Sequence, residues 1–112
     1  MSVGEWKQVS ELVKRKVLPP GKQLMSMLVE FEQGGIGPEH AHPHEQLSYI
    51  VTGKIQLTLN EQVLVAVTGD QIWVPSNTPH SIIALEDSLL LETFTPLRED
   101  LLESIADYQT GR

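Results

Sequence analysis

The amino-acid sequence predicts an all-β protein, either a sandwich or a small barrel, and two observations favour this fold class. Segments rich in β-branched and aromatic residues recur between residues 23 and 94, and turn-forming residues separate them about every 8 to 12 residues. No alternation of helical and strand-like segments competes with this pattern. A chain of 112 residues, 40% of them hydrophobic, can bury one core of domain size. We therefore expect a single domain over residues 1–112.

The expected strands follow one another after residue 22. In residues 23–31 the apolar side chains partly alternate, which suits a strand better than a helix. The glycines and the proline of residues 34–38 end this strand and are not expected to continue a ladder of strands. The other strand-like segments are residues 47–60, 63–75 and 80–94, interrupted by turns at Asn60-Glu61, Gly69-Asp70, Pro75 to Pro79 and Glu86 to Ser88.

Two helical segments are expected outside the strands. After Thr95-Pro96, apolar residues recur at helical spacing, at Leu97, Leu101, Ile105 and Tyr108. The sequence therefore predicts a short amphipathic C-terminal helix over about residues 96–109. Near the other end, Ser10 could cap a turn of helix around residues 10–16.

The composition excludes several classes of function. The net charge is −7, and five of the eight cations lie in the first 22 residues, so no basic stripe for nucleic acid is expected. Without cysteine, a metal would have to be held by histidine, carboxylate or amide groups. No apolar run approaches the roughly 18 residues that span a bilayer, and the first residues do not resemble a signal peptide. We therefore expect a cytoplasmic protein with no membrane partner.

The four histidines fall in two places, and their pattern indicates a metal site. His40, His42 and His44 alternate before a strand-like segment, and His80 follows a proline turn. On a strand, residues i and i+2 lie on one face about 6.6 Å apart, close enough for two imidazoles to meet one ion. Gln46 shares that parity. The alternative is a polar loop whose histidines are merely solvated.

The spacing also limits which histidines can act together. Residues i and i+4 of a strand are about 13 Å apart, so His40 and His44 cannot bind one ion unless Pro43 breaks the strand. Glu45 points to the face opposite that of His40 and His42. The residues alone leave open whether His40 with His42, or His42 with His44, forms the pair.

Two short motifs resemble the signatures of the cupin family. The first signature is matched, with Gln where the family usually has Glu, at Gly34, His40, His42, Gln46 and Gly53. The second is matched, with Asn where the family usually has Gly, at Gly69, Pro75, Asn77 and His80. The resemblance covers residues 34 to 84, which would form the core of the metal site. It implies a double-stranded β-helix barrel, jelly-roll-like in form, commonly assembled as a homodimer.

The resemblance also implies the metal ligands and a departure from the usual ligand set. His40, His42, Gln46 and His80 would converge inside the barrel on one divalent ion, and His44 would support these ligands or contact substrate. Three neutral imidazoles and a neutral amide leave the ion its full +2 charge, which favours an anionic ligand and Lewis-acid chemistry. Such ligands accept zinc, nickel, iron, manganese or cobalt. The alternative is a degenerate site that binds metal poorly.

The end of the last strand carries further candidate residues. Glu92 and Phe94 share one face, and Arg98 follows as the one cation between Lys54 and Arg112. If this face lies inside the barrel, burial would suit Glu92 to proton transfer, and Arg98 could bind a substrate carboxylate. The alternative places Glu92 in solvent and pairs Arg98 with an acidic residue of the helix.

A second resemblance favours the catalytic interpretation. The run His42 to Gln46, followed by Phe94 to Asp100, is similar to the small KdgF-like cupins of pectin and alginate breakdown. This resemblance implies an enzyme that converts 4,5-unsaturated uronates into linear keto sugars, with Glu92, Phe94 and Arg98 in its catalytic site. The family usually has Asp at position 92, so the proton geometry differs here. The alternatives are an oxidative cupin such as a dioxygenase, and a non-catalytic binding or sensor module.

Overall fold

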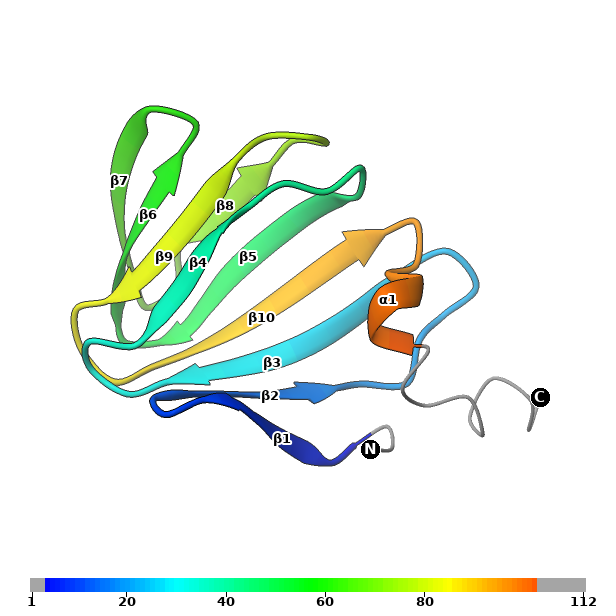
Figure 1. The fold of residues 1–112 in the computed structure, drawn as a ribbon, viewed down its shortest axis with the longest axis horizontal. Coiled ribbons are helices and arrows are strands. Elements are labelled where there is room, and N and C mark those ends of the chain that lie inside the picture. Colours follow the sequence, from blue (N-terminus) through cyan, green and yellow to red (C-terminus); the bar gives the residue numbers. More distant parts are fainter. Residues whose placement is uncertain (1–3, 103–112) are drawn as a thin grey trace.

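The computed structural model of the chain describes residues 4–102 and places ten strands in two antiparallel sheets (Figure 1). The six-stranded sheet has, in spatial order, β1 (Trp6–Ser10), β2 (Val13–Val17), β3 (Met25–Phe31), β10 (Ser88–Thr95), β5 (Glu45–Thr52) and β8 (Gln71–Val74). The four-stranded sheet has β4 (Ile36–His40), β9 (His80–Ala84), β6 (Lys54–Leu59) and β7 (Gln62–Val67). The predicted all-β fold is confirmed.

Alternation along the strands builds the core between the two sheets. In β3 and β10 every second residue is buried, because successive side chains of a strand point to opposite faces. Ile50 and Leu90 from the six-stranded sheet join Ile55 and Leu57 from the other sheet in one cluster, and all four are fully buried. The predicted hairpin turns are also present, since Asn60 and Gly69 adopt the left-handed conformation with φ of 57° and 92°.

The helical turn expected near residues 10–16 is wrong. This segment forms the antiparallel pair β1 and β2, and β2 pairs in turn with β3. Val13 and Val17 are buried at alternate positions, so the segment follows the period of a strand. Burial of these two valines against the core therefore outweighs the local capping preference of Ser10.

The expectation that residues 34–38 stay outside the sheets is also wrong. Part of the segment lies in β4, an edge strand that pairs only with β9. The register shifts between Gly37, opposite Ile82, and His40, opposite His80, so β4 carries one extra residue there. Pro38 lies within this bulge, where a residue without an N–H group is tolerated.

The C-terminal helix begins later in the chain than predicted. β10 continues to Thr95, and α1 (Glu99–Leu102) begins only after residues 96–98 have turned the chain. The Arg98 carbonyl accepts the first helical hydrogen bond, from the amide of Leu102. The rest of the predicted helix lies outside the described residues. Within residues 4–102, no helix is long and apolar enough to cross a membrane.

Candidate metal centre and its cavity

Three histidines converge at one end of the two sheets. His40 ends β4, His80 begins β9 directly opposite it, and His42 lies in the connection from β4 to β5. Their candidate ligand nitrogens all lie within 4.8 Å of one another. The expected proximity of His40 and His42 is thus present, but not on one continuous strand, because β4 ends at His40.

Hydrogen bonds to the backbone set the tautomer of each of these rings. The Nδ1 atoms of His40, His42 and His80 donate to carbonyl oxygens of Pro38, His44 and Thr78, at 3.0, 3.0 and 2.8 Å. A carbonyl oxygen can only accept, so each Nδ1 carries the proton and each Nε2 presents a lone pair. This is the arrangement in which a second hydrogen bond orients a metal-binding imidazole.

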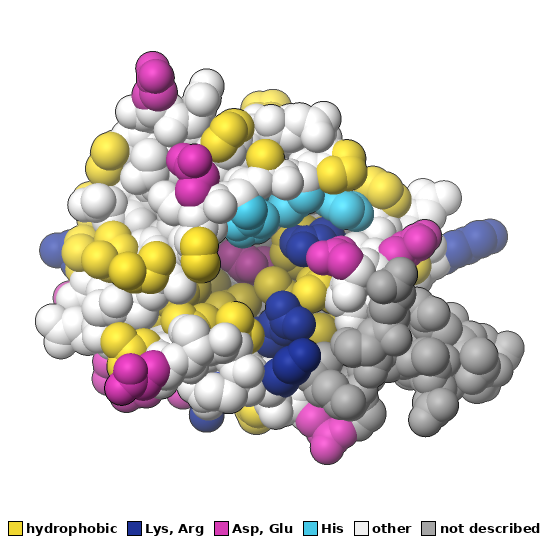
Figure 2. All heavy atoms as spheres, viewed as in Figure 1, with side chains coloured by type: hydrophobic (Ala, Val, Ile, Leu, Met, Phe, Trp, Pro, Cys, Tyr) yellow, Lys and Arg dark blue, Asp and Glu magenta, His cyan; other side chains and the backbone are white. Residues whose placement is uncertain are grey.

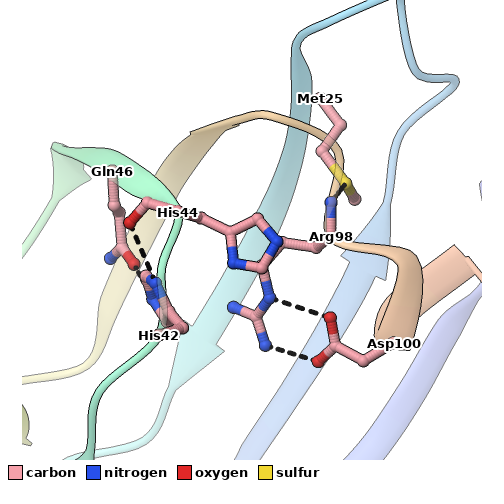
Figure 3. Close-up of polar contacts among 6 residues, drawn as sticks. All are labelled: Met25, His42, His44, Gln46, Arg98 and Asp100. Carbon is pink, nitrogen blue, oxygen red and sulfur yellow. Dashed lines mark hydrogen bonds and ion pairs between the residues drawn. The ribbon is translucent and has the colours of Figure 1, made fainter. Parts of the chain in front are cut away.

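Gln46 completes a group of four electron-pair donors. This buried residue of β5 donates from Nε2 to the Ser48 hydroxyl at 2.9 Å and to a Glu92 carboxylate oxygen at 3.3 Å. Its Oε1 atom is thereby turned toward the Nε2 atom of His42, at 3.0 Å (Figure 3). When the His42 ring is neutral, two lone-pair atoms face each other, and either a proton on Nε2 or a metal cation between them would make this contact favourable.

A buried nitrogen of His80 that has no hydrogen-bond partner within residues 4–102 also indicates a metal site. The Nε2 atom of His80 is buried and has no hydrogen-bond partner among the described residues. Leaving such an atom unsatisfied costs about 1 to 3 kcal/mol. Burial also lowers the pKa of His42 and of His80, and for His42 the positive charge of Arg98 lowers it further. Three neutral imidazole nitrogens and one amide oxygen fit a divalent transition metal.

Glu92 lies beside this group and inside the fold. It stands on β10 opposite Ser48 of β5, and it is 7% exposed. Its Oε2 atom accepts hydrogen bonds from Gln46 and from the Ser48 hydroxyl, the latter at 3.4 Å. Burial raises the pKa of Glu92 to about 7, although the Ser48 hydroxyl and the charge of Arg98 act to lower it. The interior position expected from the parity of Glu92 is therefore observed, and solvent exposure is excluded.

Phe94 and Arg98 lie next to the histidine cluster. Phe94 is fully buried on β10, and its ring centre is 5.8 Å from that of His42. The Arg98 guanidinium lies 5.0 Å from the centre of the Phe94 ring, within the range of a cation–π contact. Its Nε and Nη2 atoms also donate to both carboxylate oxygens of Asp100, at 3.0 and 2.7 Å (Figure 3). Arg98 thus forms an ion pair with an acidic residue of the helix and also lies beside the candidate site, so its two alternative positions do not exclude each other.

His44 does not join the three convergent histidines. Its ring centre is 5.4 Å from that of His42, but its nitrogens lie outside the group within 4.8 Å. Its backbone carbonyl fixes the tautomer of His42, and its own buried Nδ1 atom has no partner within residues 4–102. Of the two histidine pairs that the sequence left open, the structure brings His40 and His42 together with His80.

Five of the side chains described above face a cavity of about 170 Å³ between the sheets: His40, Gln46, His80, Glu92 and Arg98. Figure 2 shows its opening, with histidine side chains along one side, basic side chains at the rim and an acidic side chain in its depth. The polar and charged residues that line it are Arg15, His40, Gln46, His80, Ser81, Glu92 and Arg98. A shallower groove of about 690 Å³ continues outward past His42, His44 and Asp100, and it shares His40 and Arg98 with the cavity.

Arg15 is the cavity residue that the sequence analysis missed. It lies on β2 between Val13 and Val17, which are both buried, so the period of two turns its side chain inward. That alternation was visible in the sequence. The neighbouring cations Lys14 and Lys16 obscure it, because charged side chains are mostly exposed.

The comparisons with known proteins agree with this architecture. The profile of the family described as "Cupin domain" matches residues 27–94. The chain is 32% identical over 99 residues to the pectin degradation protein KdgF of Dickeya dadantii, covering 87% of this chain and 90% of that protein. The solved structure of KdgF from Halomonas sp. superposes with a TM-score of 0.83 at 34% identity, covering 88% of this chain and 91% of that one. An RmlC-like cupin from Shewanella frigidimarina gives a TM-score of 0.83 at 32% identity, covering 88% of both chains.

Proposed function

The chain belongs to the cupin family, as its two motifs predicted, and from this premise we propose a metal-dependent, non-oxidative enzyme that opens the ring of a small anionic sugar. The proposed substrates are 4,5-unsaturated uronates, and the products are the linear keto sugars. The similarity to a protein named for pectin degradation supports this substrate class. One observation carries the proposal: two of the three convergent histidines, His40 and His80, line one cavity with the buried Glu92 carboxyl.

We propose that His40, His42, His80 and Gln46 hold one divalent transition metal per chain. The bound ion would supply a Lewis acid for substrate oxygens. The four neutral ligands leave it a charge of +2, which favours an anionic substrate. The same ligands accept zinc, nickel, iron, manganese or cobalt, so the choice of metal is left to analysis of the purified protein.

The proposed reaction is an isomerisation that needs only proton movement. Opening the cyclic hemiacetal breaks the bond between C1 and the ring oxygen, and the C1 hydroxyl gives up its proton as the carbonyl forms. The ring oxygen takes up a proton and becomes an enol hydroxyl at C5, and the ketone forms when this hydroxyl loses its proton and C4 gains one. Glu92 is placed to take up and return a proton, because it is enclosed and its pKa of about 7 suits both directions.

The residues around Glu92 would orient the substrate. Arg98 borders the cavity and the outer groove, and its remaining N–H groups can donate to a carboxylate. Phe94 presents its ring to both His42 and Arg98, which limits the space between them. Holding the reacting carbon near the carboxyl is a large part of what such a tautomerisation requires.

We also propose that the protein is a homodimer. Two strands at sheet edges carry exposed apolar side chains, with Trp73 on β8 beside Leu47 of β5, and Val63, Val65 and Val67 on β7. An exposed apolar edge of this kind favours association of a second copy. Light scattering at micromolar concentration should report twice the chain mass of 12.5 kDa. A particle of the chain mass would contradict this assembly.

Metal analysis followed by a substrate screen tests the proposed function. The purified protein is loaded with each of the five metals and mixed with unsaturated galacturonate or mannuronate, and the loss of the enol-ether absorbance is followed. We expect turnover that requires metal, consumes no oxygen and gives a product of unchanged mass. Oxygen uptake with ferrous iron would indicate an oxidative cupin instead. Metal binding without turnover of any uronate would favour a binding or sensor module.

A further inference from the structure

Arg15 is a half-buried cation for which the proposed mechanism has no use. It lies opposite Val29 of β3 on the inward face of β2, and it lines the same cavity as Glu92 and His80. Its neighbours along the chain, Lys14 and Lys16, point to the other face and lie over the Trp6 ring. Of Lys14, Arg15 and Lys16, Arg15 is therefore the one that lines this cavity.

The Arg15 guanidinium lacks the partners that a cation with a buried nitrogen normally has. Its Nε atom is buried without a hydrogen-bond partner, and no ion pair within residues 4–102 involves its side chain. Burying charged groups without partners is costly, so such groups are normally paired. Arg98 differs, because Asp100 binds it through two hydrogen bonds. Of the two arginines, Arg15 thus has the larger number of free donors.

The charges around the cavity favour an anion between the two arginines. Burial lowers the pKa of Arg15, and the positive charge of Arg98 lowers it further, so the two guanidinium groups are near enough to repel each other. Asp100 opposes this effect but already binds Arg98. A ligand carboxylate would relieve the repulsion and would also satisfy the free donors of Arg15.

We propose that Arg15 binds the carboxylate of the substrate and that, with Arg98, it forms a two-arginine clamp in the cavity that both side chains line. This inference rests on the proposed function for the identity of the carboxylate as that of a uronate. Arg15 then determines specificity: it selects acidic sugars over neutral ones of the same shape. It takes no part in proton transfer, which stays with Glu92.

Two ligands of nearly the same shape, one with a charged carboxylate and one with that group esterified, provide the test. Galacturonate and its methyl ester are titrated calorimetrically into the metal-loaded protein, and the ratio of their dissociation constants is measured. Wild-type protein should prefer the acid, and Arg15→Ala should reduce that preference about ten- to a hundredfold, as expected for loss of a charged hydrogen bond. Arg15→Lys should restore part of it. Lys16→Ala, on the same strand with the same change of charge, is the matched control and should keep the wild-type ratio.

The outcomes separate the clamp from the proposed function. If wild-type protein prefers the acid, Arg15→Ala loses that preference and no uronate is turned over, the clamp stands and the ring-opening function fails. If Arg15→Ala keeps the wild-type preference, or if wild-type protein has none, the clamp is overturned whatever the turnover. Metal content and melting temperature are measured on each variant. Should Arg15→Ala fail to fold, Arg15→Gln, which keeps most of the shape without the charge, answers the same question.

Discussion

Strands β5 and β10 carry the candidate site at one end and the hydrophobic core at the other. On their inward faces Phe94 lies opposite Gln46 and Glu92 opposite Ser48, whereas Leu90 lies opposite Ile50. All of these side chains are buried. The same alternation therefore places polar groups and apolar groups in successive cross-strand pairs, about 7 Å apart along the strands.

The two ends differ in the free-energy change that accompanies burial of their side chains. Leu90 and Ile50 gain by leaving water, at roughly 25 cal/mol per Å² of apolar surface. Glu92, Ser48 and Gln46 give up hydration, and hydrogen bonds among them recover only part of it. Buried polar groups that carry such a cost indicate a functional role. Substitutions at the polar end should therefore affect function, and substitutions at the apolar end should affect stability.

Removal of a histidine at the polar end should have the largest effect. In His80→Ala the three-histidine cluster loses the nitrogen that is buried without a partner. We expect loss of metal binding, and with it loss of the rise in melting temperature that metal gives, since a ligand at one hundred times its Kd stabilises the native state by about 2.7 kcal/mol. Metal per chain is measured after dialysis, with and without added ions. Wild-type protein that stays metal-free with every divalent ion tested would rule out the site.

Glu92→Gln should have the next largest effect, and on the rate rather than on binding. The amide keeps the shape and can still accept from Ser48, but it cannot exchange a proton. We expect kcat to fall by about 10² to 10⁴ with KM and metal content nearly unchanged. A variant with wild-type kcat would remove Glu92 from the mechanism.

The stability of the metal-free protein is the control for Glu92→Gln. Burial raises the pKa of Glu92 in the folded state to about 7, so the stability contributed by its protonated form is complete below the unfolded pKa and is lost as pH rises through 7. The Gln variant lacks this loss. Its melting temperature should therefore match the wild type near pH 4 and exceed it at pH 8, and a fall in kcat could not then be assigned to unfolding.

At the apolar end, Leu90→Ala should lower stability and leave the chemistry intact. Leu90 is fully buried between β3 and β5, so truncation leaves a cavity and is expected to cost about 2 to 5 kcal/mol. The free energy of unfolding is measured with urea, and kcat and metal content are measured well below the transition. A large loss of kcat at full metal content would show that the two ends of β10 are not separable.

The sequence predicted the polar end best where strand parity applies. Glu92, Phe94 and Gln46 lie on regular strands, so their inward direction follows from a period of two. The prediction that His42 lies near His40 is correct, but the predicted geometry is wrong. The two residues do not share a strand, because His42 lies in the connection between β4 and β5. The sequence could not show which residues form hydrogen bonds with the Gln46 and Arg98 side chains. Those hydrogen bonds depend on the folded structure.

Elsewhere the errors arose where tertiary pairing overrides local preference. β4 forms despite Pro38 because β9 is available to pair with it. Pro38 lies in the bulge, where the strand ladder does not require an N–H group at that position. β2 forms despite the capping signal at Ser10 because β3 buries Val13 and Val17. Arg15 was missed for a related reason: its cationic neighbours suggested a surface, whereas only its parity with the two valines indicated the interior.

Replacement of Arg98 should give the smallest of these effects and test how the polar end holds its substrate. Removing one charged hydrogen bond costs about 1.5 to 3 kcal/mol, so Arg98→Ala should raise KM roughly ten- to a hundredfold with a much smaller change in kcat. The value should fall short of a complete loss of binding, because Arg15 lines the same cavity. Steady-state kinetics on the uronate that proves active provide the measurement.

Asp100→Asn sharpens the interpretation of Arg98→Ala. This variant keeps the guanidinium but weakens the two hydrogen bonds that hold it beside Phe94. If Asp100 serves to orient Arg98, KM should rise, but by less than in Arg98→Ala, and kcat should stay unchanged. If Asp100 instead competes with the substrate for Arg98, KM should fall. Wild-type kinetics in both variants would assign the Arg98–Asp100 pair to the helix surface and leave substrate binding to Arg15 and the metal ligands.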